Sequence, residues 1–207
     1  MSLASEPAKP NLYLRGLVAV WLVAWGVMAI HPADRREWFL MNILVLIAAL
    51  SLPYNHRYYP FTNFSYTLIA IYVFFHLLGA HYGYEQVPIG VWLKQTMGTQ
   101  RNYYDRILHF MFGLLIGYAI HEIYVRYVHP RRFLTYWRPM IIVTAVSAVY
   151  EILQVFTIVF IGTTPSVQDE TFDSQLDITV AIWGSMISMG IAWLVERRAD
   201  KRIKGPA

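Results

Sequence analysis

The sequence predicts an all-α protein, a polytopic transmembrane helical bundle of six spans with both termini in the cytoplasm. Hydrophobic residues make up 57% of the 207 residues and charged residues only 14%, against about 25% charged residues in typical soluble domains. The apolar residues gather in long stretches that polar, proline-containing segments separate. Lys and Arg are concentrated on alternate connections, which is the pattern that orients membrane proteins.

The composition also limits the chemistry and the partners. The chain has no cysteine, so disulfides and thiolate metal sites are excluded, and His and carboxylates would have to hold any metal. The net charge of +4 comes from basic residues at segment ends and in loops. It therefore indicates membrane topology and contact with membrane lipids, with no nucleic-acid partner. The sequence identifies no protein partner.

The first three spans are expected at 12–30, 38–53 and 62–80. Residues 1–11 form a polar N-terminal tail, and the apolar stretch after it approaches the roughly 20 residues that cross a bilayer. No small-x-small cleavage site follows this stretch, so we expect a retained span and not a removed signal peptide. The second span is short and ends at Pro53, and Pro60 precedes the third.

The last three spans are expected at 104–124, 139–160 and 176–195. Pro139 stands where a first-turn proline would begin the fifth span. The six spans form one domain, 12–195, and residues 196–207 form a basic cytoplasmic tail. The longest outer connection, 81–103, could cap a cavity from the outside.

The distribution of Lys and Arg orients the bundle. Of the 17 basic residues, all but five lie on the cytoplasmic side if both termini are cytoplasmic. The five on the outer side are Arg35, Arg36, Lys94, Arg101 and Arg106. An even number of spans agrees with both termini lying on one side.

Several ionisable residues lie inside these spans or at their rims. A charge there costs about 3 kcal/mol or more, so such residues usually face a bundle interior or a wet cavity. The orientation brings four segments that carry them to one depth near the outer face. We therefore expect an outward-facing pocket lined by His76, His81, Asp105, His109, Glu151, Asp173 and Asp177.

Helical spacing groups some of these side chains. Asp105 and His109 are four residues apart and share a helix face, whereas Arg106 is expected to point elsewhere, toward the outer interface. Asp173 and Asp177 share a face if their helix begins before Asp173. His and carboxylates at such spacing on neighbouring helices form the metal sites of helix bundles.

The first functional interpretation is a metal-assisted enzyme that acts on a lipid or cell-envelope intermediate. The metal would be a divalent ion such as zinc or manganese. Its expected ligands are His76, Asp105, His109 and Asp177. Glu151 and Asp173 are the expected catalytic residues, with Glu151 as general base. No cofactor-binding residue is singled out.

Two other interpretations remain open. The same acids and imidazoles could pair with one another or with Arg101 or Arg106 and simply lock the helix packing. In this reading Asp173 serves as a carboxylate at a helix N-terminus. They could also bind and release protons in a small transporter, although the inner halves of the spans contain few ionisable residues.

Two features of the fourth span carry weaker expectations. Gly113 and Gly117 form a Gly-x-x-x-Gly pair, which permits a close helix crossing. His121 and Glu122 lie at the cytoplasmic end of this span and are expected to be solvated or interfacial.

Three sequence blocks carry a resemblance to a known family. They are His76-x-x-Gly-x-His81-Tyr-x-Tyr84, then Tyr104-Asp-Arg-Ile-Leu-His109-Phe with Gly113, then Glu151 with Gln168, Asp169 and Asp173-x-Gln-x-Asp177. Together they resemble the YjdF-type inner-membrane proteins of bacteria, whose biochemical function is uncharacterised. The Asp-x-x-x-His, Glu-x-x-Gln and Asp-x-x-x-Asp blocks are more distantly similar to VanZ-like membrane proteins, one of which is associated with teicoplanin resistance.

The resemblance implies a multi-pass protein of the bacterial inner membrane with the same polar residues at its centre. YjdF-like proteins are expected to carry a Glu-x-x-Glu pair on the fifth span. Here the second position is Gln154, so Glu151 is left as the ionisable residue of that face. This departure counts against a mechanism that needs two carboxylates there.

Overall fold

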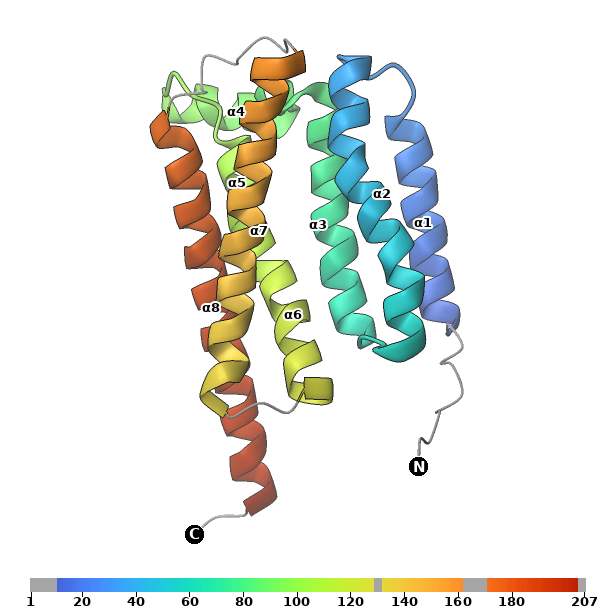
Figure 1. Cartoon of the computed structure of the whole chain (residues 1–207), viewed down its shortest axis with the longest axis vertical. Coiled ribbons are helices and arrows are strands. Elements are labelled where there is room, and N and C mark those ends of the chain that lie inside the picture. Colours follow the sequence, from blue (N-terminus) through green and yellow to red (C-terminus); the bar gives the residue numbers. More distant parts are fainter. Residues whose placement is uncertain (1–10, 129–131, 162–170, 205–207) are drawn as a thin grey trace.

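The chain folds into an up-and-down helical bundle, in which successive long helices run in opposite directions, in the computed structural model, which describes residues 11–128, 132–161 and 171–204 (Figure 1). The long helices are α1 Leu12–Met28, α2 Arg35–Tyr58, α3 Asn63–Tyr82, α7 Arg132–Ile161 and α8 Thr171–Lys204. One further long helix consists of α5 Tyr104–Met111, a π-helical turn Phe112–Ile116, α6 Gly117–Ile123 and a second π-helical turn Tyr124–Val128. The 3₁₀ turn Tyr84–Gln86 and the short helix α4 Pro88–Met97 lie between α3 and α5. The described ranges contain no strand, which confirms the all-α prediction.

Among the described residues, five helices are long and apolar enough to cross a membrane. They are Arg35–Tyr58, Asn63–Tyr82, Tyr104–Val128, Phe133–Phe156 and Asp173–Ala199. The first helix, α1, is apolar but has only 17 residues. In Figure 1 the beginning of α1 and the end of α8 lie at one end of the bundle, and α4 lies at the other.

The helix starts follow from local sequence more closely than the helix ends do. Asn11, Asp34 and Thr62 each precede an apolar run and accept a backbone N–H with a side-chain oxygen, as N-caps do. The prediction that Pro53 ends the second span is wrong, because α2 continues through Pro53 to Tyr58. The prediction that Pro139 begins the fifth span is also wrong, because this proline lies inside α7. A proline removes one backbone hydrogen bond, which a long helix with satisfied bonds on either side tolerates.

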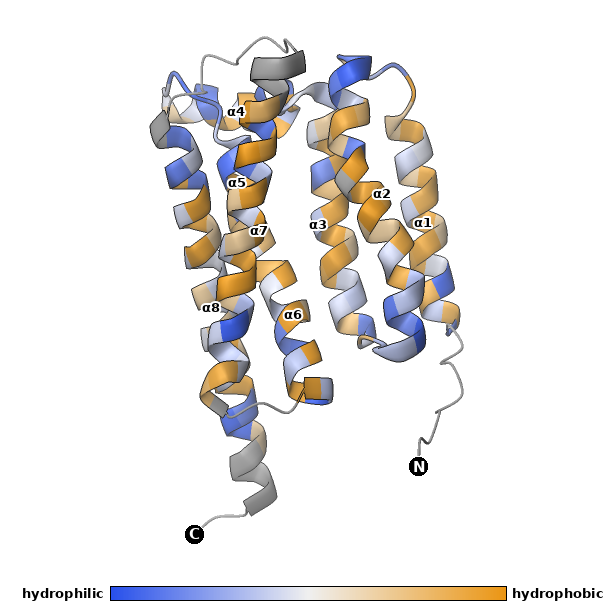
Figure 2. Ribbon diagram, in the orientation of Figure 1, coloured by the Kyte–Doolittle hydropathy of each residue, from blue (hydrophilic) through white to orange (hydrophobic). Residues whose placement is uncertain are grey.

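The bundle exposes apolar side chains and buries many polar ones. Leu50 and Val20 are 79% and 68% exposed, as expected of a surface that faces lipid. Asn42, His109 and Asp177 are buried. Figure 2 shows that hydrophobic residues dominate the middles of the helices and hydrophilic residues their ends. Buried ionisable groups in such a bundle are the candidates for function.

Glycines bring α5 and the π-helical turn after it into very close contact with α8. A methyl group added at Gly113 would overlap the carbonyl oxygen of Ala181, and one added at Gly184 would overlap the carbonyl oxygen of Phe110. The prediction of a close crossing is therefore confirmed at Gly113, whereas Gly117 makes only ordinary van der Waals contact. This crossing holds the first turns of α5 and α8 side by side, and these turns carry the candidate site.

Candidate metal-binding and acid–base site

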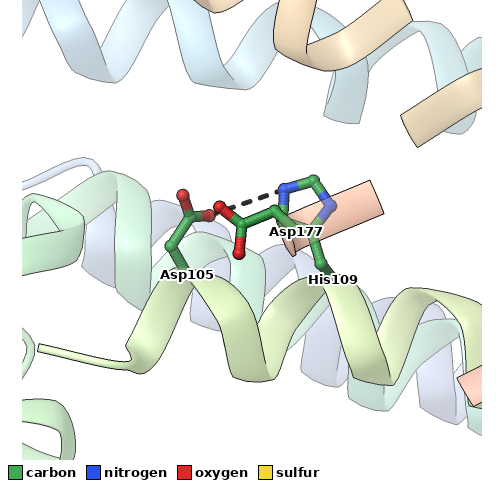
Figure 3. A group of neighbouring side chains, drawn as sticks. All are labelled: Asp105, His109 and Asp177. Atoms are coloured by element: carbon green, nitrogen blue, oxygen red, sulfur yellow. Dashed lines mark ion pairs between the residues drawn. The ribbon is translucent and has the colours of Figure 1, made fainter. Parts of the chain in front are cut away.

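Asp105, His109 and Asp177 lie together near the α4 end of the bundle (Figure 3). One potential ligand atom from each side chain lies within 4.8 Å of those of the other two. Asp105 and His109 share a face of α5, with 3.8 Å between Oδ1 and Nε2, and Asp177 comes from α8. His109 and Asp177 are buried, and the Asp105 side chain is 20% exposed. The shared face expected for Asp105 and His109 is therefore present.

A further carboxylate reaches His109 from α7. Oε1 of Glu151 lies 2.8 Å from Nε2 of His109, and both side chains are 7% exposed. The same Nε2 faces Asp105 at 3.8 Å. Carboxylate oxygens only accept hydrogen bonds unless they are protonated, so Nε2 of His109 must carry the proton of any hydrogen bond to an ionised Glu151 or Asp105.

Two arginines pair with the acids of α8. Nη2 of Arg106 lies 2.6 Å from Oδ1 of Asp173, and its Nε lies 3.3 Å from Oδ1 of Asp177. Arg101, in the connection before α5, pairs with Oδ2 of Asp173. The prediction that Arg106 points toward the outer interface is wrong. Its long side chain reaches across to α8 although its backbone position lies off the Asp105–His109 face.

The acid cluster comprises Asp105, His109, Glu151, Asp173 and Asp177. Its four carboxyl groups face two guanidinium groups and one imidazole in the described part of the chain. Asp173 has each of its oxygens paired with an arginine, whereas the other three acids converge on His109. Neighbouring like charges away from water are costly. The cluster therefore favours the binding of a proton or a metal cation.

His76 lies outside the group of metal-ligand atoms. Its Nε2 lies 3.2 Å from the Met41 carbonyl oxygen, which can only accept, so Nε2 donates and Nδ1 accepts from the Tyr84 hydroxyl at 3.1 Å. The Tyr84 oxygen lies 3.0 Å from the Tyr150 hydroxyl. Burial raises the pKa of the Tyr84 hydroxyl well above its ordinary value, which keeps it a neutral donor. Both ring nitrogens of His76 are thus engaged without a metal.

Sequence reasoning missed Tyr150 and placed His81 in the pocket. Tyr150 directly precedes Glu151, its ring lies edge-on to His109 with 5.8 Å between centroids, and its hydroxyl continues the chain to Tyr84. The sequence signal that could have identified Tyr150 was its position next to Glu151, an ionisable residue inside an apolar span. Nδ1 of His81 instead lies 2.9 Å from the Met28 carbonyl oxygen of α1, outside the acid cluster.

A second polar group, the capping cluster, lies at the opposite end of the bundle and includes the buried His121 and Glu122 and the partly exposed Glu196. Glu122 of α6 accepts from the backbone N–H and the hydroxyl of Thr62 at 2.7 and 2.8 Å. It also accepts from Ser65 and, at 2.6 Å, from Arg126. Its carboxylate thereby satisfies the N-terminus of α3, where the helix dipole favours a negative charge.

The histidine of the capping cluster is equally well paired. Nδ1 of His121 lies 2.9 Å from the Thr135 carbonyl oxygen, and its Nε2 lies 2.9 Å from Glu196. His121 and Glu122 were expected to be solvated or interfacial, and the first alternative is wrong, because these residues are only 3% and 8% exposed. Contacts from α3, α7 and α8 enclose this end of α6, and a single helix pattern does not show such contacts.

These features define the chain as a multi-pass α-helical membrane protein with a buried acid cluster. The family model described as "Predicted membrane protein (DUF2238)" matches residues 13–198, and the chain belongs to this family. It is similar to the "Inner membrane protein YjdF" of Escherichia coli (strain K12), with 29% identity over 170 residues that cover 77% of this chain and 79% of that protein. No solved structure matches the chain. The YjdF-like resemblance and the inner-membrane location are confirmed, and the similarity to VanZ-like proteins stays a prediction.

Proposed function

We propose that this inner-membrane protein is a metal-assisted enzyme that acts on a lipid or cell-envelope intermediate. The observation that carries the proposal is the convergence of Asp105, His109 and Asp177, whose potential ligand atoms lie within 4.8 Å of one another. Three protein ligands from neighbouring helices leave coordination positions for water and substrate, as in catalytic zinc sites. Carboxylate and imidazole ligands suit zinc or manganese.

The other two acids of the cluster take different roles in this proposal. Glu151, 2.8 Å from His109, is the general base that accepts a proton from the attacking water. Asp173 is better suited to positioning than to proton transfer, because Arg101 and Arg106 occupy both of its oxygens. Guanidinium groups held in this way bind the phosphate or carboxylate of an anionic substrate.

We also propose that α1 is the first of six spans and that both termini are cytoplasmic. The excess of Lys and Arg on that side supports this orientation. The shared end of α1 and α8 in Figure 1 supports only that both termini lie on the same side. The acid cluster then lies near the outer face, where lipid headgroups and envelope intermediates are accessible. Because the chain has no native cysteine, single cysteines at Lys94 and Arg197 test this directly. A membrane-impermeant thiol reagent should label the first in intact cells and not the second.

Elemental analysis of the detergent-purified protein tests the metal site. The wild type should contain about one zinc or manganese ion per chain, and His109→Ala should contain almost none. His121→Ala is the matched control, because it removes a buried, carboxylate-paired histidine from the other end of the bundle. Wild-type protein that contains no metal and binds none on titration would exclude the proposal.

A second candidate role is a structural lock, and the arginine pairs favour it. Arg101 and Arg106 tie the start of α5 to α8 through Asp173, and such pairs can fix helix register without further function. Under this role, protonation of some of the carboxyl groups neutralises the excess negative charge of the acid cluster. His109→Ala would then lower stability and leave the metal content of the preparation unchanged.

A further inference from the structure

We propose that a groove between α1, α2 and α3 binds an anionic phospholipid, with one acyl chain in the groove and the lipid phosphate at Arg15 and Arg57. This groove lies toward the end of the bundle opposite the acid cluster. The proposal is independent of the metal site, because it shares no residue with it.

The body of the groove is apolar and suits an acyl chain. It encloses about 700 Å³, within the roughly 300–1,000 Å³ of small-molecule sites. Its wall is formed by residues 14–22 of α1, 45–57 of α2 and 66–73 of α3, and the lining is apolar over most of its length. Val18 and Leu22 line it and are 46% and 52% exposed, so the groove is open along its side to the surrounding lipid.

The polar lining residues lie at one end of the groove. Arg15 lies in the first turn of α1, Arg57 in the last turn of α2 and Tyr66 in the first turn of α3. The antiparallel order of these helices brings all three to one end, where headgroups lie whichever way the protein faces. In the described part of the chain, neither arginine forms an ion pair with a carboxylate. Two cations above an apolar groove match the phosphate and acyl chain of an anionic lipid.

His56 supplies an independent observation at the same end. It lines the groove, and its Nδ1 lies 2.7 Å from the Tyr66 hydroxyl. Its Nε2 is buried and has no hydrogen-bond partner among the described residues. Buried polar atoms in native proteins normally have one. Because Nε2 is closed to solvent, a lipid phosphate or ester oxygen reaches it as an acceptor only after the side chains that cover it move aside.

Native mass spectrometry of the delipidated, detergent-purified full chain tests the proposal. The protein is titrated with phosphatidylglycerol or with phosphatidylcholine of the same acyl chains. We expect one phosphatidylglycerol to bind at least about fivefold more tightly than phosphatidylcholine, since each basic residue near an anionic headgroup contributes about that factor. The R15Q/R57Q double variant should lose this preference, with its phosphatidylglycerol affinity reduced about tenfold or more. Arg36→Gln, at the other end of α2, should keep it.

A second pair of variants tests the acyl chain. Ala49→Phe places a ring in the groove and should weaken both lipids, whereas Val20→Phe, on an exposed position outside the lining, should weaken neither. Excess inorganic phosphate should not displace the lipid. Equal binding of the two lipids by the wild type would overturn the proposal, and so would displacement by phosphate alone. If R15Q/R57Q fails to fold, the wild-type preference and the Ala49→Phe comparison still decide the outcome.

Discussion

The acid cluster and the capping cluster both combine buried histidine with carboxylates, yet they differ in how their charges are satisfied. In the capping cluster, each of the two carboxylates has several donors: Glu122 accepts from Thr62, Ser65 and Arg126, and Glu196 is paired with His121 and Tyr136. In the acid cluster, three carboxylates converge on His109. Residue type alone therefore does not separate the two clusters. They differ in the ratio of hydrogen-bond donors to carboxylates, and surplus carboxylates away from water need a proton or a metal ion.

The largest expected difference between the clusters is in metal affinity. Asp177→Asn removes a proposed ligand and should weaken zinc binding by about 100-fold or more, beyond the 10- to 100-fold typical of changes that only support a ligand. Glu122→Gln changes a carboxylate of the capping cluster and should leave affinity within about twofold. Competition against a fluorescent chelator measures both values. Equal losses in the two variants would show that the clusters do not differ in this way.

The second largest difference between the clusters should be in how much zinc stabilises the variants of each against unfolding. At a free zinc concentration 100 times the dissociation constant, the wild type should gain about 2.7 kcal/mol in its free energy of unfolding. Asp177→Asn should gain almost nothing at the same zinc concentration, and Glu122→Gln should show the full gain from a lower starting stability. SDS unfolding with and without a chelator measures this. A gain retained by Asp177→Asn would assign the stabilising metal to another site.

Without metal, a substitution in the capping cluster should lower the free energy of unfolding more than a substitution in the acid cluster does. Glu122→Ala removes the acceptor of several hydrogen bonds, each worth about 0.6 kcal/mol in membrane proteins, and should cost about 2 kcal/mol. Asp105→Ala removes one of three mutually repelling carboxylates and should cost less than about 1 kcal/mol or raise stability. SDS unfolding of the chelated variants measures both. A larger loss in Asp105→Ala would favour the structural lock for the acid cluster.

The sequence predicted which helices exist better than it predicted where side chains meet. Apolar runs placed the starts of the first, third and fourth spans within one residue of the observed Leu12, Asn63 and Tyr104, because this signal is local. Pro53 and Pro139 led to wrong helix boundaries. Whether a proline ends a helix or is tolerated inside it depends on the hydrogen bonds of the turns on either side, which the sequence does not show.

The candidate site was predictable only in part for a similar reason. Asp105 and His109 share a helix face by spacing alone, and their approach to Asp177 required the glycine crossing of α5 with α8. Arg106 turned toward α8 because of the length of its side chain. His76 is taken up by partners from other segments, the Met41 carbonyl and Tyr84. Helix rotation and tertiary partners of this kind do not appear in the periodicity of one segment.

Both clusters contain a glutamate carboxylate close to Nε2 of a histidine. Substitution of the more exposed of these two glutamates should have the smallest effect on stability. Glu196 lies 2.9 Å from His121 and is 36% exposed, whereas Glu151 lies 2.8 Å from His109 and is 7% exposed. Water and salt screen the exposed pair, so Glu196→Gln should cost only about 0.5 kcal/mol, and the cost should shrink as ionic strength rises. In chelated protein, Glu151→Gln should show no such salt dependence, because its pair lies away from solvent. SDS unfolding at low and high salt measures both variants. The same salt dependence in both variants would mean that solvent reaches the two pairs equally. The acid cluster and the capping cluster would then not differ in how strongly solvent screens their charges.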